Sequence, residues 1–103
     1  MQLKTTIEIE SGTACLDDCQ IDRLLDRIEN YLNNHLELNG VYLDSVGCHL
    51  DEIEVWFSVP LDMSNSDLKS ILLAVDGGIV AIHELDYGLY FSKDIRYEYI
   101  EAE

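Results

Sequence analysis

The feature that most constrains the fold is a run of apolar residues at helical spacing between residues 18 and 37. Their recurrence every three or four positions places them on one face of an α-helix. Asp17 is a good N-cap for this helix, and Gln20 stands in the capping-box position. Asn39-Gly40 supplies a C-terminal stop. The apolar residues of this amphipathic helix are Ile21, Leu24, Leu25, Ile28, Leu32 and Leu36.

Strands are predicted wherever apolar and polar residues alternate, because alternate side chains of a strand point to opposite faces of a sheet. The third strand ends at Pro60, since proline cannot donate to a strand ladder. The last segments of the chain are also rich in β-branched and aromatic residues. The predicted strands cover residues 3–10, 41–50, 52–59, 79–84, 89–92 and 95–100.

A second helix is predicted between the third and fourth of these strands. Ser64 and Asp67 form another capping box at its start. Gly77-Gly78 is expected to end it, and Asp86-Tyr87-Gly88 is expected to form a turn further on. The apolar stripe of this helix consists of Leu68, Ile71, Leu72 and Val75.

The element order is therefore βαββα followed by two or three strands, which predicts an α+β domain. Its first part corresponds to the split βαβ unit of the ferredoxin-like arrangement, and the last strands would form a C-terminal β-hairpin extension. We expect two helices on one face of an antiparallel sheet, with the other face wet or bound by a partner. The length of 103 residues predicts a single domain over residues 1–103.

The charge of the chain limits its function. It has 21 Asp and Glu against six Lys and Arg, a net charge of −15, while 48% of its residues are hydrophobic, as in a folded protein. Nucleic acids and anionic membranes would repel such a surface, so direct binding to either is not expected. The N-terminus has no signal-peptide pattern, and the odd cysteine count fits a reducing compartment. We expect a cytoplasmic protein, either a monomer or a small homo-oligomer.

No motif predicts catalysis, a cofactor or a metal. The chain has no nucleophile elbow, Gly-rich phosphate loop or zinc-protease motif, so it is not expected to be an enzyme. Cys15 and Cys19 straddle the predicted start of the first helix. Cys48 and His49 are adjacent in a strand and therefore point to opposite faces. These cysteines and histidines are not expected to form a zinc site.

The first candidate binding surface is an acidic stripe on the first helix, opposite its leucines. Residues four apart are separated by ~6 Å along a helix axis, and successive phosphates of a nucleic-acid strand are spaced comparably. Such a stripe is also common on helices that merely face water, and this alternative stays open. The members of the stripe are Asp18, Asp22, Asp26 and Glu29.

Two further groups are candidates for partner binding. Glu52, Glu54 and Trp56 are expected on the outward face of the sheet, and tryptophan is enriched at interface hot spots. Tyr97 and Tyr99 alternate with carboxylates, which suits recognition of an arginine-rich surface. Alternatively, a loop or the last strand covers Trp56, and the tyrosines reflect ordinary strand composition.

In size and charge the chain resembles phage-encoded DNA mimics, anti-restriction proteins and anti-CRISPR proteins, although it matches no motif of any one family. The resemblance implies a small acidic inhibitor that occupies the basic nucleic-acid-binding surface of another protein. Two alternatives remain open. One is an immunity protein that neutralises a bacterial nuclease toxin, and the other is a non-catalytic regulatory or structural subunit whose charge keeps it soluble.

Overall fold

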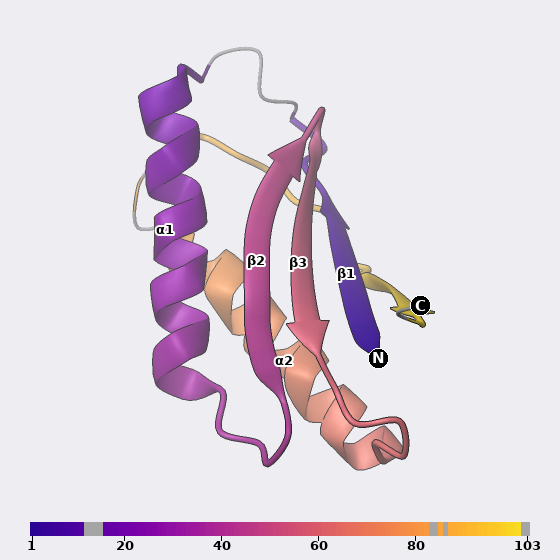
Figure 1. The fold of residues 1–103 in the computed structure, drawn as a ribbon. Helices are drawn as coiled ribbons and strands as arrows, with labels where there is room; N and C mark the ends of the chain where they lie inside the picture. Colours follow the sequence, from indigo (N-terminus) through magenta and orange to yellow (C-terminus); the bar gives the residue numbers. More distant parts are fainter. Residues whose placement is uncertain (12–15, 83–84, 86, 102–103) are drawn as a thin grey trace.

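The protein folds into a four-stranded antiparallel sheet and two helices, an α+β architecture as predicted from the sequence (Figure 1). The computed structural model describes residues 1–11, 16–82, 85 and 87–101. The strand order in the sheet is β2-β3-β1-β4, and each neighbouring pair is antiparallel. The elements are β1 (Gln2–Glu8), α1 (Asp18–His35), β2 (Tyr42–His49), β3 (Glu52–Ser58), α2 (Asn65–Ile82) and β4 (Arg96–Ile100).

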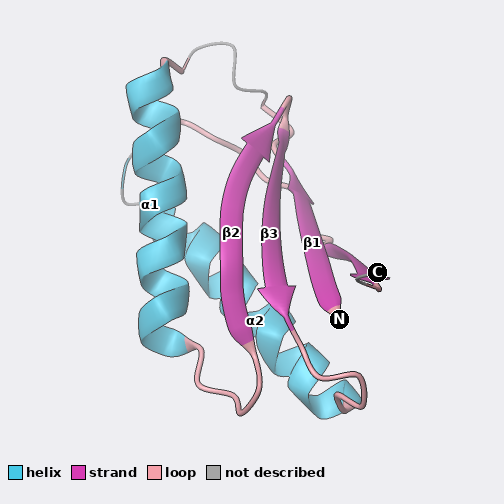
Figure 2. Cartoon of the chain, viewed as in Figure 1, coloured by secondary structure: helices cyan, strands magenta, loops and turns pink. Residues whose placement is uncertain are grey.

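One face of the sheet is apolar and packs against the helices. In the two central strands Leu3 of β1 lies opposite Phe57 of β3, and both are fully buried. Thr5 is accommodated on this face because its hydroxyl donates a 3.1 Å hydrogen bond to the carbonyl of Val55. Figure 2 shows α2 behind the sheet and α1 alongside β2. The helix residues that complete the core are Leu24, Ile28, Leu32, Leu68, Ile71, Val75, Ile79 and Ile82.

The N-terminus of α1 confirms the predicted capping box. The Asp17 carboxylate accepts a 2.8 Å hydrogen bond from the backbone N–H of Gln20, and the Gln20 side chain accepts a 3.0 Å bond from the N–H of Asp17. At the other end the helix stops at His35, two residues before the expected end. Gly40 follows in the turn with a φ of 78°, a conformation that favours glycine.

The second helix is longer than the sequence suggested. Ser64 caps its start, with its hydroxyl accepting a 3.1 Å hydrogen bond from the N–H of Asp67. The helix then continues through Gly77-Gly78 to Ile82, so the predicted helix end is wrong. The strand predicted over 79–84 is wrong for 79–82, which are helical, while 83 and 84 lie outside the described residues.

The two glycines serve a close contact between the helices and not a helix stop. The ring of Tyr31 from α1 lies against α2 where a side chain of residue 77 would point, and a Cβ there would be 2.7 Å from Tyr31 Cζ. Beyond the glycines, Ile79 and Ile82 continue the buried stripe of α2. A Gly-Gly pair can either end a helix or allow two helices to pack closely, and the contact with Tyr31 shows that here it allows close packing.

The C-terminal part of the chain also differs from the prediction. Residues 89–92 form no strand, and only Phe91 makes an isolated bridge, with Ile9. The strand predicted over 95–100 is confirmed as β4, and it pairs with β1. Because 79–82 are helical, the expected C-terminal hairpin is not found in the part of the chain that the structure describes. Gly88 has a φ of 70°, as a turn requires, and Asp86 of the predicted turn lies outside the described residues.

The contact between Tyr31 and the glycines predicts that alanine at position 77 and alanine at position 78 change the free energy of unfolding differently. Alanine is more favourable than glycine within a helix by about 1 kcal/mol. Gly78→Ala should therefore stabilise the protein, since its Cβ would lie 3.5 Å from Ile28 Cγ2, an ordinary contact. Gly77→Ala should destabilise it relative to Gly78→Ala by about 1–3 kcal/mol, because the Tyr31 ring must be displaced. Urea unfolding measures both changes.

The control for this comparison is Tyr31→Ala, which removes the ring. In that background the two alanine substitutions should have similar effects on the free energy of unfolding. Equal effects in the wild-type background would show that Tyr31 does not restrict residue 77.

Candidate functional site

The predicted acidic stripe lies on the solvent-exposed face of α1. All four members, Asp18, Asp22, Asp26 and Glu29, are exposed. The opposite face of the helix is buried by Leu24, Ile28 and Leu32. The stripe is therefore an accessible row of carboxylates about three turns long.

Folding extends this row at one end of the molecule. Figure 1 shows that α1 begins at the end of the molecule where the β2–β3 turn lies and where β1 finishes. The backbone N–H of Ile9 donates a 2.7 Å hydrogen bond to the carbonyl of Asp51, which joins the end of β1 to that turn. Exposed carboxylates stand at or next to the ends of these elements, and we call this group the acidic end: Glu8, Glu10, Asp17, Asp18 and Asp51.

The open face of the sheet is different because two of its glutamates, Glu52 and Glu54, have cationic partners. Lys4 Nζ lies 3.4 Å from Glu54 Oε1 and 5.6 Å from the centroid of the Trp56 ring. The indole N–H of Trp56 donates a 3.4 Å hydrogen bond to Glu54. The tryptophan is therefore on the outward face, in the predicted phase, and is held by neighbours on its own face.

A second ion pair crosses the same face at the other end of β3. Glu52 is directly opposite Glu8, an unfavourable pairing of like charges. Arg96 of β4 offsets it, with one guanidinium nitrogen 3.1 Å from Glu52 Oε2. The sequence did not predict the contact with Arg96, since it depends on β4 pairing with β1 and not with its sequence neighbours.

Tyr97 and Tyr99 lie on the opposite face of the sheet from Trp56. Their Cα partners in β1 are Thr5 and Leu3, two residues of the core face. The tyrosines nevertheless stay 50% and 39% exposed, because β4 is the edge strand. The rings meet edge to face, with centroids 6.1 Å apart. Burial raises the pKa of Tyr99, with Tyr97 contributing further.

The nine predicted binding residues therefore occupy three separate surfaces. The stripe lies on α1, the Glu52, Glu54 and Trp56 group lies on the open sheet face, and Tyr97 and Tyr99 lie on the other face of the edge strand. The structure does not bring them into one site. Of the three groups of predicted residues, the stripe on α1 has the largest number of carboxylates, and its first member, Asp18, also belongs to the acidic end.

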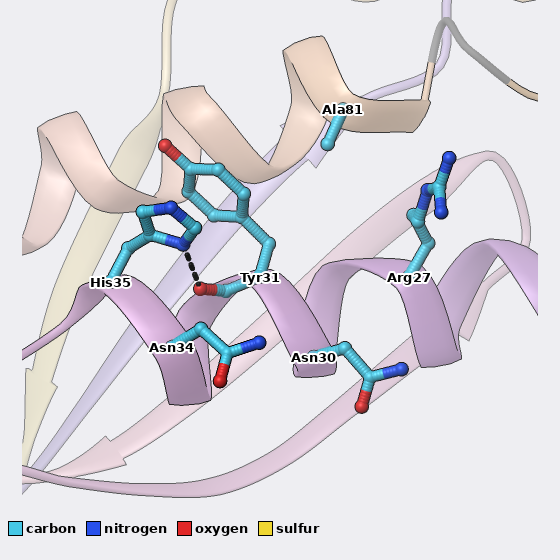
Figure 3. Close-up of a pocket in the computed structure, with 6 residues that line it drawn as sticks. All are labelled: Arg27, Asn30, Tyr31, Asn34, His35 and Ala81. Atoms are coloured by element: carbon cyan, nitrogen blue, oxygen red, sulfur yellow. Dashed lines mark hydrogen bonds between the residues drawn. The ribbon is translucent and has the colours of Figure 1, made fainter.

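A groove between α1 and α2 was not anticipated (Figure 3). Arg27, Tyr31 and His35 line it from α1, and Ala81 lines it from α2. His35 stacks on Tyr31 with ring centroids 4.1 Å apart, and its Nδ1 lies 2.9 Å from the Tyr31 carbonyl oxygen. In Figure 3 the side chains of the two lining asparagines point away from α2. The polar groups do not converge on one point, as those of a ligand pocket do.

The α1 helix also carries two arginines, which bear on the net charge near the stripe. Arg27 is half-buried and lies toward α2 in Figure 3. Arg23 is the other arginine of α1, and it is exposed. The four exposed carboxylates of the stripe therefore outnumber the two arginines of α1.

The thiols and histidines that the structure describes show no arrangement for a metal. Cys48 faces the core side of β2 opposite Ile53, whereas His49 lies opposite Glu52 on the open side. Cys19 and Cys48 are free thiols, and Cys15 lies outside the described residues. No group of three His, Cys, Asp or Glu side chains in the described ranges could hold a metal ion. Among the described helices, none is long and apolar enough to cross a membrane.

Comparisons with known proteins identify no family. No family model matches the chain, and no curated protein matches it. A solved structure titled "De novo designed protein Foldit4" is similar, with 17% sequence identity, 97% of each chain covered and a TM-score of 0.49.

The two described thiols should differ in reactivity. Partial burial raises the pKa of Cys48, and the negative charge of Asp51 raises it further. Because the thiolate is the form that reacts, iodoacetamide should modify the exposed Cys19 before Cys48 at neutral pH. The rate of Cys48 modification should still increase with pH above ~8.5, which is the ordinary pKa of a cysteine thiol. Peptide mass spectrometry follows each site, and faster labelling of Cys48 would contradict this assignment.

Proposed function

We propose that this protein is a small acidic inhibitor that binds the basic nucleic-acid-binding surface of another protein and competes with its DNA or RNA. The observation that carries the proposal is the exposed stripe of Asp18, Asp22, Asp26 and Glu29, continuous with the acidic end of a domain with a net charge of −15. On this proposal the carboxylates replace the phosphates of the nucleic acid. The partner is a nucleic-acid-binding or nuclease protein, and the inhibitor itself catalyses no reaction.

The physical basis is electrostatic steering. Complementary potentials raise the rate at which two proteins meet and fix their relative orientation. A basic groove that binds phosphates already holds arginine and lysine side chains, and carboxylates accept bidentate hydrogen bonds from arginine. A rigid helix holds its carboxylates at regular intervals, so little conformational entropy is lost when they bind.

The stripe is the preferred surface because the glutamates of the open sheet face are partly neutralised. Glu54 is paired with Lys4, and Glu52 is paired with Arg96. A basic partner would have to compete with these ion pairs. We therefore assign the primary contact to α1 and the acidic end, with Trp56 and the tyrosines of β4 outside it.

We also propose that the scaffold is a ferredoxin-like domain. The order βαββαβ and the antiparallel sheet order β2-β3-β1-β4 support this assignment. Cytoplasmic location is part of the same proposal, supported by the free thiols Cys19 and Cys48.

Charge reversal on the stripe should abolish binding without unfolding the domain. Asp22→Lys with Asp26→Lys changes two exposed residues opposite the buried face of α1, and exposed changes usually alter stability by less than ~0.5 kcal/mol. Immobilised wild-type protein should retain basic nucleic-acid-binding proteins from a cell extract at low salt. The double variant should not retain them, and each retained protein should lose labelled DNA or RNA when the wild type is added.

The matched control is Glu37→Lys with Asp62→Lys, which changes the net charge by the same amount at two exposed loop positions away from the stripe. The control should still displace the nucleic acid. If both double variants fail equally, total charge and not the stripe determines binding. If retained proteins keep their nucleic acid in the presence of the wild type, the proposed competition is wrong.

Salt should weaken the complex mainly through the association rate. The Debye length falls from ~30 Å at 0.01 M to ~8 Å at 0.15 M ionic strength, so the steering field shortens over this range. Stopped-flow or surface-based kinetics with a retained partner measure this dependence. An association rate that stays constant would indicate an apolar contact, and Trp56 would then be the residue to replace first.

A further inference from the structure

The outward face of α2 carries a stripe of residues that no other part of the described chain covers. Leu73 is 64% exposed and Val80 is 59% exposed, and both are large apolar residues of a helix whose other side is in the core. The remaining members are also exposed. This outer α2 stripe consists of Ser66, Lys69, Leu73, Asp76 and Val80, spaced alternately by three and four residues so that they line one side of the helix.

The surroundings of the outer α2 stripe are electrically balanced, unlike the chain as a whole. A shallow hollow beside Leu73 is lined by two lysines and two aspartates together with Leu72 and Ile95. The charged residues are Lys69, Asp76, Lys93 and Asp94, so their formal charges cancel. No described residue forms an ion pair with Lys69 or Asp76. A second molecule of charge −15 would meet much less repulsion here than at α1 or the acidic end.

The stripe is complementary to itself when two copies are placed antiparallel. A two-fold axis through Leu73 brings the Leu73 side chains of the two copies together. The same operation places Lys69 of one copy opposite Asp76 of the other, and it does so twice. Ser66 then lies opposite Val80. This is the pattern of an isologous interface, in which one patch contacts the same patch of a second subunit.

We propose that a second copy of this chain docks on the outer α2 stripe, forming a symmetric dimer through antiparallel α2 helices. Burial of Leu73 supplies the apolar centre of the contact, and two Lys69–Asp76 pairs set the direction and the register. A single helix pair buries a small area by the standard of stable interfaces, so the dimer is a weak one. This inference is independent of the proposed inhibitor function, because it uses a different helix.

Analytical ultracentrifugation of the full chain tests the dimer directly. The wild type should shift from 11.8 kDa toward twice that mass as its concentration rises from about 10 µM to about 1 mM, following mass action. The ionic strength should be at least 0.15 M, where a Debye length of ~8 Å screens the repulsion between acidic surfaces. A wild type that stays at one chain's mass throughout would overturn the proposal.

Charge-swap variants test the register. In the dimer of Lys69→Asp, the carboxylate at position 69 of each copy faces Asp76 of the other copy. In the dimer of Asp76→Lys, the ammonium group at position 76 of each copy faces Lys69 of the other. Each single variant should lower the association constant by ~10-fold or more, since like charges in contact are unfavourable. Combining Lys69→Asp with Asp76→Lys restores opposite charges and should restore association to near the wild-type level.

Each swap has a control with the same charge change at an exposed position elsewhere. Arg23→Asp matches Lys69→Asp, and Asp62→Lys matches Asp76→Lys. The controls should dimerise like the wild type, and circular dichroism checks that every variant is folded. If single swaps behave like their controls, or if the double swap fails to restore a dimer that the singles lose, the antiparallel α2 interface is wrong.

Discussion

Self-repulsion among the carboxylates is the constraint on which the arrangement of this protein depends. The chain has 21 Asp and Glu, and none of those that the structure describes is buried. At the surface a pair of unit charges 4 Å apart interacts by only about 1 kcal/mol in water, whereas the interaction grows steeply in a low-dielectric interior. The core is accordingly built from Leu, Ile, Val and Phe side chains, with Thr5 as a described polar member.

The same constraint determines how the cations are used. Lys4 and Arg96 stand on the open sheet face, where cross-strand pairing forces glutamates close together. On α1 the carboxylates are separated by helical turns and need less compensation. The structure therefore relieves repulsion where strand pairing concentrates it and leaves it on α1, the helix to which we assign the proposed contact.

Elements with a strong local pattern were predictable from the sequence. The capping box at Asp17, the first helix and the strands over 41–50 and 52–59 depend on neighbours within a few residues, and the structure reproduces them. The errors began at Gly77-Gly78, where the local signal for a helix stop competes with a contact to Tyr31, a residue 46 positions earlier. Residues 79–82 are apolar and mostly β-branched, a composition that is also typical of a strand. Their helical conformation in α2 depends on the packing of α2 against α1.

The candidate site was predictable only in part, for a related reason. Exposure of the α1 stripe follows from the periodicity of its helix, and the outward phase of Trp56 follows from alternation in β3. The ion pair that neutralises Glu52 cannot be predicted from local periodicity, because Arg96 reaches Glu52 through the pairing of β4 with β1. Tyr97 and Tyr99 were predicted to suit an arginine-rich surface because they alternate with carboxylates. Their position relative to Trp56 and the glutamates, on the opposite face of the sheet, follows only from the register of β4 with β1.

The two proposed contacts use different helices, and this separation has a consequence for binding. In an antiparallel α2 dimer each copy keeps its own α1 stripe, related to the other by the two-fold axis. A partner with two basic surfaces, or a pair of partners on one nucleic acid, could engage both stripes at once. The second contact would then be intramolecular, and its gain would depend on whether the spacing of the stripes matches that of the basic surfaces. Weak self-association would thus strengthen inhibition of symmetric partners more than that of monomeric ones, without any additional carboxylate on the chain.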